Sequence, residues 1–195
     1  MDEIRERIKK FRRYIKMTDG DKVARRYFIM NSFDGVVTML GLLISMYFTG
    51  FNSIDRMITV SLCTALAMSI SGIAGAFIAE KSEREIEITE LERAMLSDLS
   101  HSIYADAIKY TIIWVSFVNA VSPLIATSII ITPLMLEHFH ILNNSPVYSV
   151  IIALTYLFIL GVKLAKMTGK NMLIGGLKMI AIGILTALIL IVLLR

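Results

Sequence analysis

The sequence predicts an all-α, polytopic membrane protein with five transmembrane helices, an N-terminal amphipathic helix and a cytoplasmic acidic helix between helices 2 and 3. Hydrophobic residues make up 56% of the 195 residues, against about 45–50% in an ordinary soluble domain. Charged residues are only 18% of the chain, and they are bunched rather than spread. The mean hydropathy is +0.70. These observations indicate a chain built for lipid.

Long stretches with almost no charge predict the five membrane helices in order. Each stretch is close to or above the ~20 residues that cross a bilayer core of about 30 Å. Each must be helical, because hydrocarbon offers no partner to a free backbone amide. We therefore expect no β structure. The stretches cover residues 27–54, 57–79, 110–136, 141–162 and 171–194.

Two polar segments complete the predicted organisation. Residues 1–24 form a cytoplasmic amphipathic segment, and residues 25–195 form the transmembrane domain, with an acidic helical insertion at about 80–106. Apolar residues recur at helical spacing in both segments, which is typical of a helix with one apolar face. They are Ile4, Ile8, Phe11 and Ile15 in the first, and Ile88, Leu91, Met95 and Leu99 in the second.

The distribution of lysine and arginine predicts the orientation. Ten of the twenty precede the first helix, and most others fall between helices 2 and 3 or between helices 4 and 5. Cytoplasmic loops carry the excess of these residues, so we expect a multi-pass cell-membrane protein with its N-terminus in the cytoplasm and its C-terminus outside. The net charge of +4 follows from this topology and requires no nucleic-acid partner.

Asp34 is the only charged residue between Arg26 and Asp55. A carboxylate inside the bilayer costs roughly 2.5–3.5 kcal/mol, so such residues usually face a cavity, a partner or a cation. Met30 and Thr38 share its helix face at i−4 and i+4, and their sulfur and oxygen atoms suit Fe²⁺ or Mn²⁺. The alternative is a structural role, in which Asp34 caps the helix or pairs locally near Arg26.

The acidic insertion allows two interpretations. Several glutamates recur at steps of three and four residues, which places them on one helix face. They either collect divalent cations before transport or form a solvated charged face neutralised by Arg84 and Arg93. The cation-collecting candidates are Glu83, Glu87 and Glu90.

Several other polar and small residues allow a purely structural interpretation as well as a functional one. Pro123 can kink the third helix and expose a carbonyl, or can be plain architecture. Gly72 and Gly75 allow close helix packing or a dimer seam. His138 and His140 are either surface residues or metal ligands outside the membrane. The sequence lacks the phosphate loops, zinc helices and nucleophile elbows that mark enzymes.

Four segments in order resemble the vacuolar iron transporter family, in a short form of prokaryotic type. They are RRYFIMNSFDGVVTMLGLLISM, SGIAGAFIAEKSERE, SPLI and KMTGKNMLIGGLKMIAIGILTALI, within residues 25–195. The family's helix-two Met and Glu correspond here to Gly72 and Thr64. Met68, one turn from Gly72, is the candidate replacement.

The resemblance implies a homodimer that exports Fe²⁺ or Mn²⁺ from the cytosol in exchange for protons, with the metal as substrate and no resident cofactor. Asp34 would alternate between metal-bound and protonated states, and Met30, Thr38 and Met68 would complete the site. Two alternatives stay open. One is a non-transporting membrane scaffold or sensor whose acidic helix binds a partner, and the other is transport of a different cargo.

Overall fold

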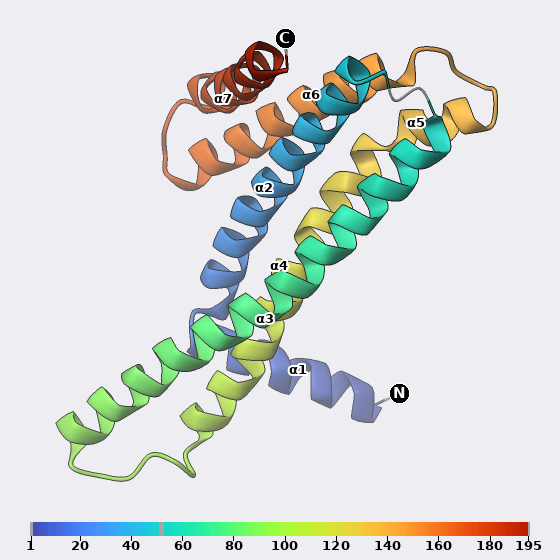
Figure 1. Ribbon diagram of the computed structural model, residues 1–195. Coiled ribbons are helices and arrows are strands. Elements are labelled where there is room, and N and C mark those ends of the chain that lie inside the picture. The colour runs from blue at the N-terminus through green and yellow to red at the C-terminus, as the bar shows by residue number, and fades with distance from the viewer. Residues whose placement is uncertain (1, 51–52, 195) are drawn as a thin grey trace. The chain divides into compact units, whose positions relative to one another are not determined.

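The computed structural model describes residues 2–50 and 53–194, and within these ranges all helices and strands that it contains are α-helices (Figure 1). This confirms the all-α part of the predicted fold class. The seven helices of the described residues are α1 (Asp2–Met17), α2 (Gly20–Phe48), α3 (Ile54–Met95), α4 (Ile103–Ile130), α5 (Thr132–His138), α6 (Ser145–Met167) and α7 (Met172–Leu193).

Five of these helices, α2, α3, α4, α6 and α7, are long and apolar enough to cross a membrane. Of these, α3 is the longest, with 42 residues. At 1.5 Å per residue it measures about 63 Å, which is about twice the hydrocarbon thickness of a bilayer. A bilayer therefore covers only part of α3, and its acidic second half continues as the same unbroken helix.

The third apolar stretch differs from the single helix predicted over residues 110–136. Helix α4 ends at Ile130, and the short helix α5 begins at Thr132 with Pro133 in its first turn. Proline has no amide hydrogen, and its ring clashes with the carbonyl four residues earlier, so it is well tolerated at a helix start and kinks or breaks a helix interior. Pro123, in contrast, lies inside α4 without ending it.

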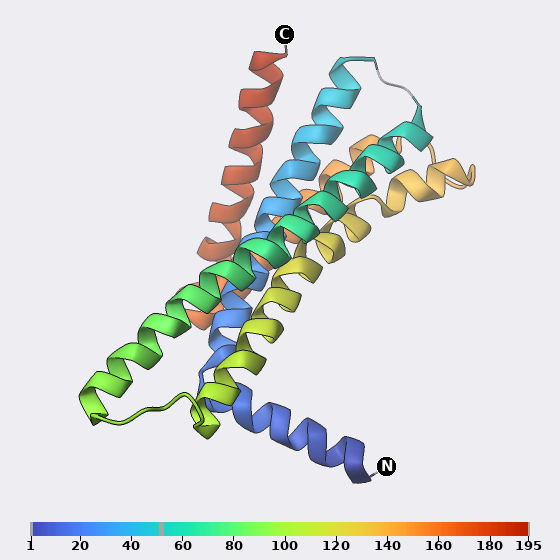
Figure 2. The same ribbon diagram turned by 60° about the horizontal axis from the view of Figure 1, so that its bottom comes forward.

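The chain forms two compact units, and helices α2, α3 and α4 contribute to both. Unit 1 comprises residues 1–28 and 70–121. In this unit α1 packs against the start of α4: Phe11 meets Trp114 edge-on with ring centroids 5.6 Å apart, and the Thr18 and Thr111 hydroxyls are hydrogen-bonded at 2.5 Å. Figure 2 shows α1 running away from the start of α4.

Unit 2 comprises residues 29–69 and 122–195. Its core is formed by fully buried aliphatic side chains, among them Leu40 from α2, Ile130 from α4 and Leu157 from α6. Helices α6 and α7 lie against each other as a hairpin, and they meet where Gly161 faces Gly175. A Cβ atom on Gly175 would lie 2.7 Å from the Gly161 carbonyl oxygen, so glycine is what allows this approach.

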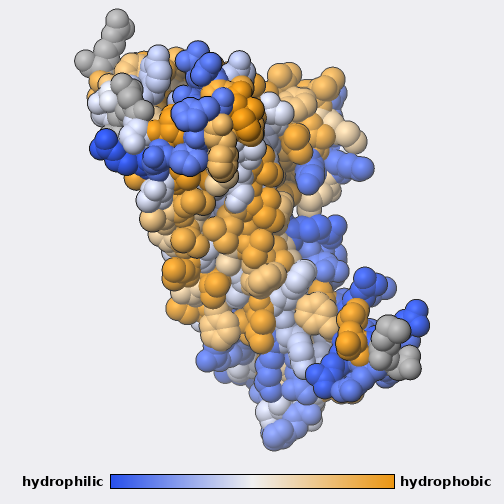
Figure 3. Space-filling view, turned by 90° about the vertical axis from the view of Figure 1, so that its right-hand side faces the viewer, coloured by the Kyte–Doolittle hydropathy of each residue, from blue (hydrophilic) through white to orange (hydrophobic). Residues whose placement is uncertain are grey.

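The outer surface of the long helices is strongly apolar. Many large hydrophobic side chains are exposed, including Ile70 at 69% and Val192 at 77%. Figure 3 shows hydrophobic side chains forming a broad area in the middle of the visible face, with hydrophilic side chains gathered toward the top and the bottom of the view. Soluble proteins rarely expose so large an apolar area, so this surface is consistent with contact with lipid.

Candidate functional site

Asp34 lies near the middle of α2, and its side chain is exposed in the single chain. It follows Arg26 by eight residues, which places it about 12 Å further along the helix axis. Within the described part of the chain, no basic side chain forms an ion pair with it. The structure therefore does not contain the ion pair near Arg26 that the structural interpretation of Asp34 predicted.

The neighbouring glycine explains why Asp34 points outward. A Cβ atom on Gly35 would lie 3.1 Å from Cα of Pro123, so at this residue α2 packs closely against α4. Successive residues of an α-helix are rotated by about 100° around its axis. Because Gly35 faces α4, Asp34 is turned away from that contact and onto the outer surface of unit 2.

The other residues predicted for the metal site lie on two helices. Met30 is exposed at 57%, and Thr38 is half-buried, one turn before and one turn after Asp34 on α2. Met68 is half-buried on α3. Among the described residues, no three His, Cys, Asp or Glu side chains lie close enough together to hold a metal ion. A single chain therefore offers Asp34 as a lone carboxylate beside a thioether and a hydroxyl.

Gly72, which the sequence resemblance aligned with a methionine of vacuolar iron transporters as an expectation, is in contact with a polar side chain of α4. The Asn119 side-chain amide of α4 donates a hydrogen bond to the Gly72 carbonyl at 2.8 Å, and a Cβ on Gly72 would lie 3.3 Å from that amide nitrogen. A methionine at residue 72 would have to displace Asn119. In this chain the site near Gly72 is therefore a polar contact between α3 and α4.

Several hydroxyls inside unit 2 are buried without a hydrogen-bond partner among the described residues. Helical Ser and Thr side chains usually bond the carbonyl four residues earlier, and a buried unpaired hydroxyl costs roughly 1–3 kcal/mol. Water is the usual partner of such groups. The hydroxyls belong to Ser32, Ser61, Thr127, Ser145 and Ser149.

At the acidic end of α3, a buried arginine organises the glutamates. The Arg84 guanidinium donates to Glu87 at 2.7 Å and to the Thr18 carbonyl oxygen at 3.2 Å, and it lies 3.8 Å from the Glu80 carboxylate. Arg84 and Glu80 are 8% and 5% exposed. Neutralisation by Arg84, which the sequence left open, is therefore present for part of this face.

The predicted cation-collecting glutamates have different surroundings. Glu83 and Glu90 are exposed, whereas Glu87 is half-buried and also accepts a hydrogen bond from the Tyr104 hydroxyl. Of these three glutamates, Glu83 and Glu90 are thus the ones exposed to solvent. Sequence reasoning missed Tyr104, and also Tyr27, which hydrogen-bonds Glu80. The only available signal was that Tyr27 begins the first apolar stretch and Tyr104 lies shortly before the third.

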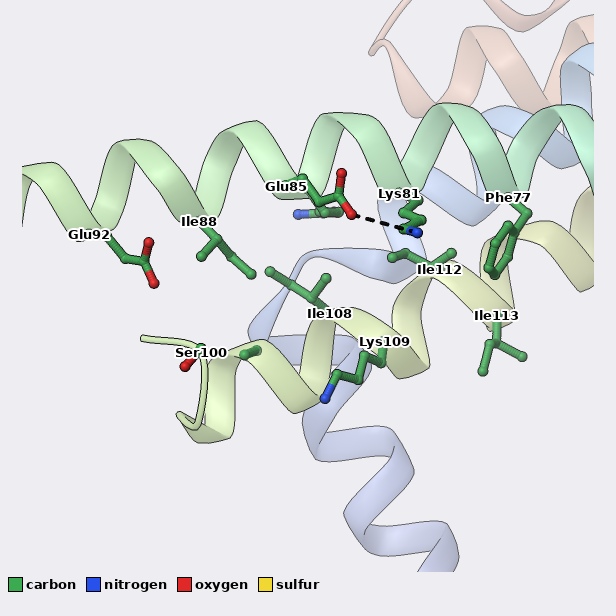
Figure 4. A pocket seen from close by; sticks show the side chains of 12 residues that line it. Phe77, Lys81, Glu85, Ile88, Glu92, Ser100, Ile108, Lys109, Ile112 and Ile113 are labelled. Atoms are coloured by element: carbon green, nitrogen blue, oxygen red, sulfur yellow. Dashed lines mark ion pairs between the residues drawn. The ribbon is translucent and has the colours of Figure 1, made fainter. Parts of the chain in front are cut away.

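A pocket of about 470 Å³ lies between the acidic end of α3 and the start of α4. Figure 4 shows Ile88 of α3 facing Ile108 and Ile112 of α4 across it, with the Lys81–Glu85 ion pair at its edge. The apolar stripe predicted for the acidic insertion is only partly buried. Ile88 and Leu91 are half-buried, while Met95 is 62% exposed.

In unit 2, the His138 side chain lies against a carboxylate. Its Nδ1 atom is 2.6 Å from Asp55 Oδ1. Both side chains are largely exposed, at 49% and 71%. Glu137 accepts a hydrogen bond from the Ser145 amide at 2.6 Å instead of joining His138. The geometry is that of a surface pair that ties α5 to the start of α3.

Comparison with known proteins shows similarity to an archaeal protein. The chain is 29% identical over 160 residues to an uncharacterized protein of Methanocaldococcus jannaschii, with 80% of this chain and 81% of that protein covered. No family model matches the chain, and no solved structure matches it. The resemblance to vacuolar iron transporters stays a prediction, and the chain is similar over most of its length to this archaeal protein.

Proposed function

We propose that this protein is a homodimeric transporter that exports Fe²⁺ or Mn²⁺ from the cytosol in exchange for protons. The observation that carries the proposal is the outward-facing Asp34 in the middle of an apolar helix. An uncompensated carboxylate facing lipid costs roughly 2.5–3.5 kcal/mol. A bound cation, a proton or a covering subunit each removes that cost.

Metal and protons would compete for the same carboxylate. A bound cation favours the charged form of a carboxylate and a low-dielectric surrounding favours the neutral form. Asp34 would therefore release a proton when it takes up metal, and the reverse on the other side of the membrane. Met30, Thr38 and Met68 would supply further ligands; the oxygen ligands suit Mn²⁺, and a thioether suits Fe²⁺ better than it suits hard cations such as Mg²⁺.

A second copy of the chain would complete the site. One chain offers a lone carboxylate at this depth, and a two-fold interface would bring two Asp34 side chains to one seam. The same contact would withdraw Met30 and its apolar neighbours from lipid. In this arrangement the buried hydroxyls of unit 2 would be satisfied by water along the path.

Glu83 and Glu90 would attract cations at the cytoplasmic end of α3, and Glu87 would join them only on release from Arg84. The positive-inside distribution supports a topology in the cell membrane in which α1, the acidic end of α3 and the α6–α7 turn are cytoplasmic and the C-terminus is outside. Metal would thus be collected on the cytoplasmic side before it reaches Asp34.

The decisive experiment is metal uptake into inside-out vesicles by the wild type and Asp34→Asn. The amide keeps the size and removes the charge, so we expect Fe²⁺ and Mn²⁺ flux and coupled proton release to fall to background. Asp21→Asn is the matched control, because Asp21 lies in the first turn of the same helix, outside the apolar stretch, and should leave flux unchanged. Unchanged flux in Asp34→Asn would end this mechanism.

The alternative, a membrane scaffold or sensor, is favoured by one observation. Glu87 and Glu80 already have Arg84 and tyrosine partners, so part of the acidic face is saturated without metal. A scaffold would give no metal-dependent proton movement in proteoliposomes for several divalent metals. It would instead retain a soluble partner through Glu83 and Glu90.

A further inference from the structure

Helix α1 is strongly basic and incompletely covered. Among its residues are seven lysines and arginines and only three acidic residues. On its apolar face, Ile4 and Ile8 are 65% and 51% exposed, while Ile15 is buried. Among the described residues, much of the apolar surface in the half of α1 near its N-terminus is therefore left uncovered.

A groove of about 580 Å³ lies along this half of α1, next to α4. It is lined by Ile4, Arg7, Ile8, Lys10, Phe11 and Tyr110. The lining combines aliphatic and aromatic side chains with two cations and contains no carboxylate. Arg7 also pairs with Glu3 at 2.9 Å, but both side chains are 80% exposed, and such pairs contribute little.

The contacts between α1 and α4 determine the level in the bilayer at which this groove would lie. Tyr14 packs on Tyr110 at 5.3 Å, and Phe11 packs on Trp114, at the point where the apolar part of α4 begins. Tyr and Trp concentrate where hydrocarbon meets headgroups. If α4 crosses the bilayer, these contacts hold α1 at that boundary.

We propose that this groove binds an anionic phospholipid of the cytoplasmic leaflet. An acyl chain lies against Ile4, Ile8 and Phe11, and the phosphate is held by Arg7 and Lys10. Long basic side chains can lay their stems on apolar surface and direct their charges to the headgroup layer. An amphiphile matches this lining better than a water-soluble anion, because it covers the aliphatic residues as well as the cations. The proposal is independent of metal transport.

The single tryptophan, Trp114, provides a built-in probe. The full-length protein is reconstituted in phosphatidylcholine bilayers that contain a small fraction of either dibrominated phosphatidylglycerol or dibrominated phosphatidylcholine, which quench nearby indoles. We expect stronger quenching of Trp114 by the brominated phosphatidylglycerol at equal fraction. Equal quenching by the two lipids would overturn the proposal.

A matched pair of variants separates the groove from general charge attraction. Arg7→Gln with Lys10→Gln removes the groove cations, and Arg5→Gln with Lys9→Gln removes the same charge from exposed residues outside the lining. One cation near an anionic surface contributes about 1 kcal/mol, or roughly fivefold in affinity. The Arg7/Lys10 variant should therefore lose at least about fivefold more of the preference for phosphatidylglycerol over phosphatidylcholine than the Arg5/Lys9 variant. An equal loss in both pairs would leave only surface attraction and would refute the groove.

Another occupant of the same face, a second copy of the chain, is tested with Ile8→Cys in a Cys63→Ser background. A spin label on the introduced thiol should be more accessible to oxygen, which enters lipid, than to a nickel chelate, which stays in water. Cross-linking of two chains through the introduced thiol, or preferential access by nickel, would also overturn the lipid assignment.

Discussion

Replacement of Arg84 by methionine tests whether the buried charge cluster holds the acidic end of α3 in place. Arg84→Met keeps most of the side-chain volume and removes the guanidinium. That group contacts Glu87 at 2.7 Å, the Thr18 carbonyl oxygen at 3.2 Å and Glu80 at 3.8 Å. Glu80 is only 5% exposed, so the change removes the ion-pair partner of a buried carboxylate.

The magnitude follows from what each carboxylate retains. Removal of one partner of a buried ion pair typically costs about 3–5 kcal/mol. Here Glu87 keeps the Tyr104 hydroxyl and Glu80 keeps the Tyr27 hydroxyl, and Glu87 is 37% exposed. We therefore expect a loss at the lower end, about 3 kcal/mol. Glu80→Gln added to Arg84→Met should recover part of it, because the lone buried charge is gone.

The assay is hydrogen exchange of the amides in residues 80–95 in detergent micelles, since the end of α3 can open without global unfolding. A loss of about 3 kcal/mol corresponds to roughly a hundredfold lower protection. Lys81→Met is the matched control. Its pair with Glu85 spans 3.8 Å between side chains 56% and 67% exposed, so it should cost less than about 1 kcal/mol. Equal protection changes in the two variants would refute the buried-pair reasoning.

Two further perturbations test other parts of the molecule. Gly161→Ala should destabilise unit 2 by about 1–3 kcal/mol, because the new Cβ meets the Gly175 carbonyl oxygen. Gly75→Ala, where a new Cβ would have nothing within 4 Å, should be neutral or stabilising by up to about 1 kcal/mol. Thermal unfolding in detergent measures both variants, and an equal effect would contradict the close glycine contact. In the α3–α4 loop, the Ser100 amide donates to Asp98 at 2.8 Å and holds the pKa of that carboxyl below its usual range. Since the pKa of Asp98 is lower in the folded state, the stabilising contribution of this contact is present above the usual pKa of aspartate and is lost as pH falls through the lowered pKa. Amide exchange of Ser100, corrected for intrinsic rates, should show this loss of protection, and Asp98→Asn should abolish the pH dependence.

Much of the fold could be predicted from the sequence, and less of the candidate site. The five apolar helices were found because each apolar stretch is long enough on its own to cross a bilayer. The break after Ile130 was missed although Pro133 signals it, because hydropathy continues through Leu136. The tyrosine partners of Glu80 and Glu87 could not be predicted, because Tyr27 of α2 and Tyr104 of α4 reach them from other helices.

The sequence by itself determined which segments are helical and apolar, since helix formation in lipid is a sum of local contributions along one segment. It also determined that Asp34 lies within such a segment. Only the tertiary structure decided where that carboxylate points. The rotation of α2 about its own axis depends on the approach of Gly35 to Pro123, two residues far apart in the chain, and hydropathy contains no information about that contact.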